Sequence, residues 1–210
     1  MRSREHWENV YERKQPDQVS WYRPHLEQSL RFIEAAGLAA DAPIIDVGGG
    51  ASTLVDDLLA RGHSNLTVLD VSPRAIESAK ARLGTRAADV HWLVADITTV
   101  DLPPAAYAFW HDRAVFHFLR DEAERRRYVA TVRRSVKPGG HVLVATFGPA
   151  GPTTCSGLDV VRYGADQLYA QFGADFQKVD DAIEIHTTPG ASEQQFVYCA
   201  CRLSSTNPHK

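Results

Sequence analysis

The fold of this chain is decided by Pro43-Ile44-Ile45-Asp46-Val47-Gly48-Gly49-Gly50-Ala51-Ser52. The apolar residues predict a buried strand. The glycine triplet predicts a tight turn at which backbone approaches a ligand closely, because glycine has no Cβ. A helix is expected from Ser52 to Gly62. Such a strand–turn–helix unit is typical of an α/β domain with a parallel sheet.

Strand and helix patterns alternate from this unit to residue 147. Ser72-Pro73 predicts a helix start, because serine is a good N-cap and proline fits the first helical turn. Lys137-Pro138-Gly139-Gly140 predicts a turn. The expected strands are 43–47, 66–70, 90–96, 107–110 and 141–147, and the further helices are 74–83 and 121–136. This alternation indicates a doubly wound, mostly parallel sheet.

The C-terminal part departs from the alternation. Residues 182–186 and 195–202 are strand-like, with Pro189-Gly190 between them and no helix. The pattern predicts a β-hairpin, so that an antiparallel strand closes one edge of the sheet.

The 210 residues fit a single domain, 1–210, in three parts. Residues 1–40 are a helical lead-in or lid, with helices expected from Arg4 to Lys14 and after Pro24 as far as Gly37. Residues 41–203 are a Rossmann-like core, and residues 204–210 are a polar tail. A chain of this length buries roughly 70% of its unfolded surface, so it needs no structural metal.

Charge and hydropathy argue against several classes of partner. The net charge of −3 and the absence of a basic stripe argue against nucleic-acid binding. The arginines at 125–127 and 133–134 are interrupted at helical spacing, which is typical of a solvated helix face. No apolar run approaches the ~20 residues of a membrane span. Three cysteines, without a signal peptide, do not suggest disulfides, so a cytoplasmic protein is expected.

Three acidic residues lie at the ends of the first three strands, where ligands bind such sheets. Asp46 precedes the glycine turn, Asp70 ends the second strand and Asp96 ends the third. A carboxylate at Asp70 can accept hydrogen bonds from both hydroxyls of a ribose, and Asp96 is within reach of an exocyclic amine on adenine. Each acid alone is more often a helix cap or a solvated loop residue. Together, beside the glycine turn, they predict an adenosine site.

A dinucleotide site is disfavoured by Thr53. The NAD fingerprint G-x-G-x-x-G, counted from Gly48, requires glycine or alanine at that position. The sequence also lacks a Tyr-x-x-x-Lys or similar pair for hydride transfer. An NAD-dependent oxidoreductase is therefore the third hypothesis.

From about Trp7 to the C-terminal hairpin, the chain resembles the class I S-adenosylmethionine-dependent methyltransferases. The resemblance implies a seven-stranded Rossmann-like sheet with an antiparallel last strand, and S-adenosylmethionine as the cofactor. It implies that the glycine loop holds the methionine part, the second acid the ribose, and the third acid with its apolar neighbour the adenine. The implied residues are Asp46, Gly48, Gly49, Gly50, Ser52, Asp70, Val71, Asp96 and Ile97. Ser52 stands where many members have a third glycine.

A closer resemblance is to small bacterial members of this superfamily whose activities are mostly unassigned. They share an opening like His6-Trp7-Glu8-Asn9-Val10-Tyr11 followed by Ser20-Trp21-Tyr22, and a later segment like Asp112-Arg113-Ala114-Val115-Phe116-His117-Phe118-Leu119. Its Asp-Arg-Ala part is also similar to the thiopurine S-methyltransferase group, which methylates small thiols. Trp21 and Tyr22 either form a lid whose aromatic face attracts the sulfonium or pack the lead-in helix.

The resemblance puts the segment after the fourth strand at the methyl group. The enzyme must mainly position and desolvate the acceptor, and needs a base only for a protonated, weak nucleophile. His111 is a candidate base and cofactor contact, with Asp112 next to it. Arg113 either binds an anionic substrate or pairs with Asp112.

Cysteines and one further histidine offer weaker candidates. Cys155 lies in a loop after the fifth strand that can reach the mouth of the site, where it either handles a soft acceptor or is an ordinary loop residue. His117, between Phe116 and Phe118, is expected to be buried. Cys199 and Cys201 alternate in a strand and have no second pair of ligands, so no metal site is expected.

The leading hypothesis is methyl transfer to a small-molecule acceptor, such as a thiol or another soft nucleophile. A 210-residue chain leaves little room for a macromolecular recognition domain. Protein-lysine methylation is the second hypothesis, which an acidic groove would favour. A non-catalytic protein that binds an adenosine ligand is the alternative outside the enzymes. The sequence does not indicate the oligomeric state.

Overall fold

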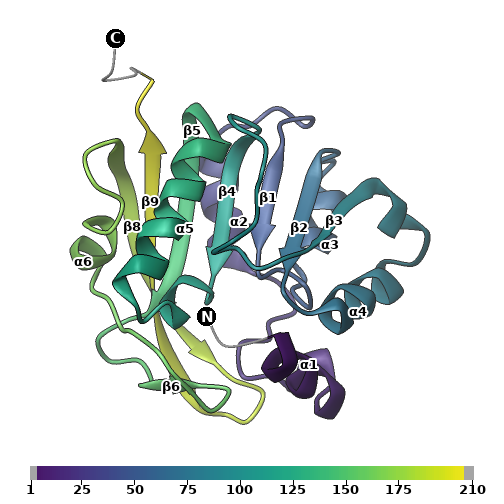
Figure 1. Cartoon of the computed structure of the whole chain (residues 1–210). Helices are drawn as coiled ribbons and strands as arrows, with labels where there is room; N and C mark the ends of the chain where they lie inside the picture. The colour runs from purple at the N-terminus through teal and green to yellow at the C-terminus, as the bar shows by residue number, and fades with distance from the viewer. Residues whose placement is uncertain (1–3, 206–210) are drawn as a thin grey trace.

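A computed structural model describes residues 4–205 (Figure 1). Its main sheet has seven strands in the order β3-β2-β1-β4-β5-β9-β8, and β9 alone runs opposite to the other six. The strands are β1 (Ile44–Val47), β2 (Leu66–Asp70), β3 (Val90–Val94), β4 (Tyr107–Arg113), β5 (Val136–Phe147), β8 (Phe176–Thr187) and β9 (Glu193–Leu203). The predicted Rossmann-like sheet and C-terminal hairpin are confirmed.

Helices cover both faces of the sheet. The first face packs against α2 (Glu27–Ala35), α3 (Leu54–Ala60) and α4 (Pro73–Leu83), and the second against α5 (Glu122–Ser135) and α6 (Ala165–Tyr169). In Figure 1, α5 lies in front of the sheet and α2 and α3 lie behind it. The 3-10 turns are η1 (Pro16–Gln18), η2 (Gly84–Asp89) and η3 (Phe116–Phe118).

The carboxyl edge of the parallel strands is covered by two small elements. These are α1 (Arg4–Arg13) and the hairpin of β6 (Thr154–Cys155) and β7 (Leu158–Asp159), which lie below the sheet in Figure 1. The predicted lead-in helices are confirmed as α1 and α2. Within residues 4–205, no helix is long and apolar enough to cross a membrane. The predicted tail at 204–210 lies outside the described residues from 206 onward.

Local sequence signals explain the helix starts. The Ser72 hydroxyl accepts a hydrogen bond from the Ala75 amide at 3.1 Å, with Pro73 as the first helical residue, as predicted. At α5, the Asp121 carboxylate accepts from the amides of residues 123 and 124. Each cap satisfies amides that have no partner inside the helix.

Strand β4 is longer than the sequence indicated. The prediction ended it at Trp110, whereas it continues to Arg113 because Asp112 and Arg113 pair with Val144 and Ala145 of β5. Successive strand side chains point to opposite faces. His111 and Arg113 therefore lie on the face of α2, and Asp112 lies on the face of α5.

The predicted turn at 137–140 is a bulge within β5 rather than a separate turn before it. Tyr107 pairs with Val136 and Phe109 pairs with His141, so four residues of β5 stand opposite one residue of β4. Gly139, with φ +76°, supplies the left-handed conformation that such a bulge needs. The elements β6, β7 and α6 were not predicted, because each spans five residues or fewer.

Candidate active site

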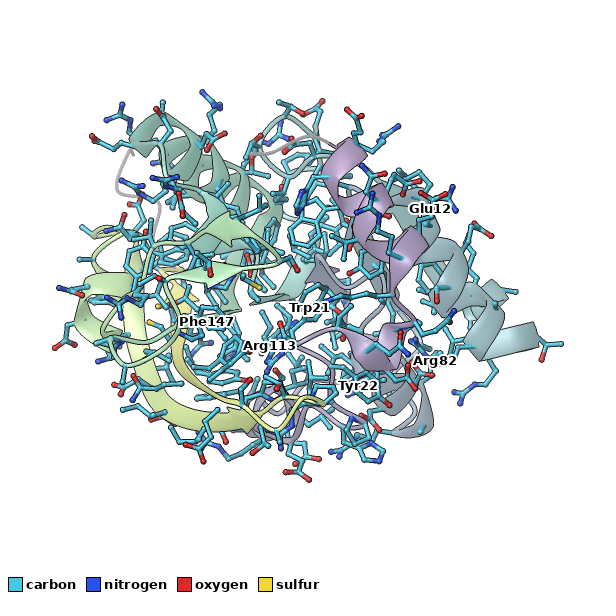
Figure 2. The ribbon with its side chains drawn as sticks, turned by 90° about the horizontal axis from the view of Figure 1, so that it is seen from below. Glu12, Trp21, Tyr22, Arg82, Arg113 and Phe147 are labelled. Atoms are coloured by element: carbon cyan, nitrogen blue, oxygen red, sulfur yellow. The ribbon has the colours of Figure 1, made fainter. Side chains whose placement is uncertain are left out.

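Two adjoining cavities open at the carboxyl edge of the parallel strands. The larger encloses about 630 Å³ of empty space and the smaller about 430 Å³, in part open to solvent. Both volumes fit a small-molecule site. Trp21, Gly48 and Arg113 line both cavities. Figure 2 looks onto this edge, with Trp21, Tyr22 and Arg113 near its centre.

The predicted glycine turn forms part of the wall between the cavities. Gly48 has φ +71°, and a Cβ there would lie 2.1 Å from Val115 Cγ2. A Cβ on Gly50 would lie 2.6 Å from Ala75 Cβ and 2.8 Å from Asp70 Oδ2. No side chain fits at either position. The turn needs glycine at position 48 for its left-handed conformation and at both positions for space.

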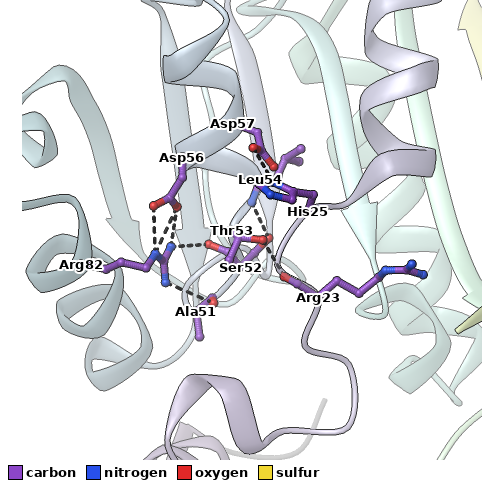
Figure 3. Close-up of polar contacts among 9 residues, drawn as sticks. All are labelled: Arg23, His25, Ala51, Ser52, Thr53, Leu54, Asp56, Asp57 and Arg82. Atoms are coloured by element: carbon purple, nitrogen blue, oxygen red, sulfur yellow. Dashed lines mark hydrogen bonds and ion pairs between the residues drawn. The ribbon is translucent and has the colours of Figure 1, made fainter. Parts of the chain in front are cut away.

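The far side of the turn is held by Arg82 of α4 (Figure 3). Its Nη2 donates to the Ser52 carbonyl at 2.6 Å and to Asp56 Oδ2 at 2.7 Å, and its Nη1 donates to the Ala51 carbonyl at 3.5 Å. The Ser52 hydroxyl accepts from the Leu54 amide at 3.1 Å, at the start of α3. The sequence analysis missed Arg82, because no local pattern joins residues 26 to 31 positions apart.

Asp70 is the buried carboxylate of the larger cavity. Its Oδ2 accepts from the Gly50 amide at 3.0 Å and its Oδ1 from the Ser72 amide at 2.8 Å. Burial nevertheless raises the pKa of Asp70 to about 6. Val71 and Ile97, both predicted contacts, line the same cavity.

Asp46 lies in the wall of the smaller cavity, together with Gly49 and Ser52. Its Oδ1 is 2.6 Å from His111 Nδ1, whereas its buried Oδ2 has no hydrogen-bond partner among the described residues. A buried carboxylate oxygen without a partner is costly. Asp46 Oδ2 can therefore accept a hydrogen bond from a donor group of a ligand.

Asp96 occupies a different position from the other two acids. Its Oδ1 accepts from both the amide and the hydroxyl of Thr98, at 2.8 and 2.7 Å. Its neighbours Ala95 and Ile97 line the larger cavity, but Asp96 itself is not part of that lining. Its contact with adenine stays a prediction.

His111 is buried, with 1% of its side chain exposed. Its Nδ1 meets Asp46 and its Nε2 lies 2.9 Å from the Ser29 hydroxyl, so both ring nitrogens have protein partners. A general base must reach the proton that it removes. The contacts of His111 instead orient Asp46, and the proposed role as a base is not supported by this placement.

Asp112 points to the opposite face of the sheet, and the suggested pairs with His111 and Arg113 are not formed. Its carboxylate accepts from the Tyr128 hydroxyl at 2.6 Å and from the Val115 amide at 2.9 Å. Burial raises the pKa of Asp112 to about 6. It lines neither cavity, so its contacts stabilise the turn after β4 rather than a ligand.

Arg113 connects the site to the C-terminal hairpin and to the N-terminal segment. Its Nε donates to the Tyr198 hydroxyl and its Nη1 to the Trp21 carbonyl, both at 3.0 Å. Its Nη2 is 3.7 Å from Glu184 Oε2, and the guanidinium lies 4.2 Å above the Phe196 ring. Five per cent of its side chain is exposed.

The segment that carries Trp21 and Tyr22 is held in place on several sides. The Thr53 hydroxyl donates to the Arg23 carbonyl at 2.9 Å, as Figure 3 shows. Arg23 forms an ion pair with Glu184, and His186 Nε2 lies 2.7 Å from the Ser20 carbonyl. The segment is therefore a bound wall between the cavities, whereas a lid would have fewer attachments.

Aromatic side chains close the larger cavity. Trp7 meets Trp21 and Phe118 edge to face, with ring centroids 6.0 and 5.1 Å apart, and Tyr11 lies 6.3 Å from Trp21. Trp7 and Tyr11 come from α1, which has no fully buried residue. The Glu8 carboxylate attaches this helix to α4 by accepting from the Ser72 hydroxyl and the Arg74 amide.

Cys155 lines the larger cavity, as its predicted loop position suggested. Burial raises the pKa of its thiol to about 11, so the thiol is protonated at neutral pH. His117 is fully buried, as expected, and burial lowers its pKa to about 3. Cys199 and Cys201 face each other at 3.5 Å as free thiols. Residues 4–205 contain no cluster of three potential metal ligands.

Comparisons with known proteins agree with this geometry. A family model described as a methyltransferase domain matches residues 44–140. The chain is 27% identical to malonyl-[acyl-carrier protein] O-methyltransferase of Paenibacillus sp. (strain JDR-2), over 59% of this chain and 45% of that protein. It is 23% identical to EEF1A lysine methyltransferase 2 of Homo sapiens, over 69% and 67%. Residues 44–140, which carry the glycine turn and the acids of the site, are therefore similar to a methyltransferase domain.

The same fold occurs in a solved methyltransferase. The N-methyltransferase NodS of Bradyrhizobium japonicum WM9, in complex with S-adenosylhomocysteine, superposes with a TM-score of 0.70 at 20% identity, over 93% of this chain and 97% of that one. The chain spans less than half of the first curated relative and about two thirds of the second.

The cofactor that the sequence analysis expects is S-adenosylmethionine, which supplies an electrophilic methyl group on a sulfonium. The residues present fit it. The turn at Gly48 leaves room for a ligand against the backbone, Asp46 Oδ2 lacks a partner among the described residues, and Asp70 lies in a mainly apolar cavity.

Proposed function

We propose that this protein transfers a methyl group from S-adenosylmethionine to a small-molecule acceptor, such as a thiol or another soft nucleophile. The observation that carries the proposal is the position of Asp70, buried beside the glycine turn in a cavity whose other walls, apart from Arg113, are mainly apolar and aromatic. The carboxylate supplies charged acceptors for ribose hydroxyls, and the whole cavity, about 630 Å³ including space open to solvent, is in the size range of small-molecule sites.

The cofactor contacts follow from the two cavities. Asp70 accepts from the ribose, Val71 and Ile97 pack on the adenine with Asp96 near its amine, and Asp46 accepts from the methionine ammonium in the smaller cavity. Gly48, Gly49, Gly50 and Ser52 offer backbone to the methionine part. Trp21 and Tyr22 complete the wall, and His111 acts through Asp46.

Protein-lysine methylation is the alternative, since one relative is named for it and another for malonyl-[acyl-carrier protein]. A lysine acceptor needs an acidic, open groove. The larger cavity is instead closed by Trp7, Trp21 and Phe118, and Asp70 is its only acidic lining residue among those described. This favours a small acceptor. We further propose that the chain forms one domain and works in the cytoplasm, where its three free thiols are stable.

Thermal unfolding with S-adenosylmethionine, S-adenosylhomocysteine or NAD tests the cofactor site. A ligand present at about 100 times its dissociation constant should add about 2.7 kcal/mol to the free energy of unfolding. We expect stabilisation by both sulfur compounds, lost in Asp70→Ala and kept in Asp159→Ala, an exposed carboxylate paired with Arg120. Stabilisation by NAD alone would reject the proposal.

Transfer of labelled methyl groups tests the acceptor. We expect label in small thiols and none in proteins of a cell extract. Label in a protein lysine would favour the alternative, and tight binding of the cofactor without transfer to any acceptor would indicate a non-catalytic binder.

A further inference from the structure

The acceptor end of the larger cavity is defined here by five of its lining residues that are not assigned to the adenosine: Trp7, Trp21, Arg113, Phe118 and Cys155. These side chains come from α1, the segment before α2, β4, η3 and β6. Three of the five are aromatic. The end is thus shaped for an apolar or planar molecule with one polar group facing Arg113.

No group at this end is ready to remove a proton. The titratable lining residues of the larger cavity, within residues 4–205, are Tyr11, Asp70, Arg113 and Cys155. Burial raises the pKa of Tyr11 well above its ordinary value and that of Cys155 to about 11, so both are already protonated. Asp70 is held by two backbone amides beside the glycine turn. His186 lines neither cavity, and His111 is occupied.

The charged residue of the acceptor end is Arg113, and it shares its carboxylate partner with another arginine. Glu184 is shared between Arg23, whose Nη1 is 2.5 Å from Oε1, and Arg113, whose Nη2 is 3.7 Å from Oε2. Oε2 also accepts from the Tyr198 hydroxyl at 2.7 Å. Arg23 also lies 4.0 Å from Glu27 Oε2, so it has two carboxylate partners, whereas Arg113 has the longer contact with the shared Glu184.

The Nη2 atom of Arg113 is the donor that remains. It is buried and has no hydrogen-bond partner among the described residues, although Nε and Nη1 are both paired. A buried charged donor without an acceptor is unfavourable, and an anion supplies the acceptor. Trp21 is held by the same guanidinium through its carbonyl, so Arg113 lies directly behind the aromatic wall.

Building on the proposed function, we propose that the acceptor is a small apolar or aromatic molecule that reacts as an anion, such as a thiolate, phenolate or carboxylate, with Arg113 beside its charged atom. A lone pair of the anion forms the new bond to the methyl carbon, and the carbon–sulfur electron pair stays on sulfur. A negative charge and a positive charge are cancelled, and no proton has to move. This step matches a cavity without a base.

The same features disfavour an amine. A lysine is an ammonium at neutral pH, so it needs a base before it can attack, and the positive charge at Arg113 opposes its entry. The acceptor end offers neither a base nor a free carboxylate within the described residues.

The probe for this inference is 4-nitrophenol, a small planar acid whose visible absorbance reports its ionisation. It would be bound to the protein saturated with S-adenosylhomocysteine and titrated with pH. We expect the pKa of the bound phenol to fall by about one unit or more relative to the free compound, as an opposite charge produces at close range.

Arg113→Gln should abolish the shift, and Arg113→Lys should keep part of it. Arg120→Gln is the matched control, because this arginine pairs with Asp159 on the surface and should leave the shift unchanged. Binding of S-adenosylhomocysteine to each variant shows that it is folded.

A bound phenol with an unchanged or raised pKa would overturn the inference, and so would failure of the wild-type complex to bind the phenol. Either result leaves the cofactor site intact. Failure to bind S-adenosylhomocysteine would instead reject the proposed function itself.

Discussion

The two ends of the larger cavity are built in different ways. At the cofactor end, Asp70 is fixed by the backbone amides of residues 50 and 72. The turn that begins at Gly48 lies at the same carboxyl edge of the sheet. At the acceptor end, Arg113 is fixed by Trp21, 92 positions away, and by Tyr198, 85 positions away. One end depends on backbone and glycine, and the other on side chains from remote segments.

This difference suggests that substitutions at the two ends affect different properties of the protein. Backbone amides stay in place when most side chains are replaced. At the cofactor end, substitutions should therefore be harmful mainly at the glycines and the acidic residues. A wall of side chains changes shape with each substitution. Substitutions at the cofactor end should therefore alter the affinity for the cofactor, and those at the acceptor end should alter the choice of acceptor.

Gly48→Ala should have the largest effect. It forces a Cβ onto Val115 at a left-handed φ, so the free energy of unfolding should fall by roughly 2–4 kcal/mol. Gly62→Ala is the matched control, because Gly62 has φ +87° with no atom within 4 Å of a Cβ. It should lose about 1–2 kcal/mol. Urea denaturation measures both, and equal losses would show that the close approach to Val115 is unimportant.

Asp70→Asn should weaken S-adenosylhomocysteine binding about 10- to 100-fold, since hydrogen bonds to a charged acceptor contribute about 1.5–3 kcal/mol. Asp112→Asn is the control: its carboxyl has the same raised pKa, about 6, but lines neither cavity. Calorimetric titration of both variants would sharpen the comparison. Equal losses of affinity would mean that Asp70 acts through the fold and not through contact.

The affinity should also depend on pH. Burial raises the pKa of Asp70 to about 6 in the free protein, and ribose hydroxyls donate best to the ionised carboxylate. The dissociation constant should therefore rise as pH falls through about 6, by up to about tenfold per unit. Binding near that pH should release protons, and Asp70→Asn should remove both effects. A flat profile in the wild-type protein would contradict this.

Trp21→Leu should have the smallest effect on cofactor affinity. It tests the residue that lies between the two ends of the cavity. If the indole faces the sulfonium, affinity for S-adenosylmethionine should fall about 5- to 10-fold more than affinity for S-adenosylhomocysteine, because a cation–π contact contributes about 1 kcal/mol. Competition binding measures the ratio. An equal loss for both ligands would leave Trp21 as packing alone, which is the other reading of its sequence position.

Much of the cofactor end could be predicted from the sequence. The strand before Gly48, the acid at the end of β2 and the Ser72 cap are all local patterns, and each was confirmed as structure. The extension of β4 was missed, because pairing with β5 and not the propensity of residues 111–113 decides it. That extension places Asp112 on the opposite face of the sheet from His111 and Arg113.

By itself, the sequence determined the order of strands and helices, the glycine turn and the acids at the strand ends, because hydrophobic periodicity and turn chemistry act over a few residues. Only the tertiary structure decided which side chains share a cavity. It placed His111 between Asp46 and Ser29, turned Asp112 toward Tyr128, and brought Arg113 to Trp21. Contacts between residues far apart in sequence depend on strand order and register, which no local pattern contains.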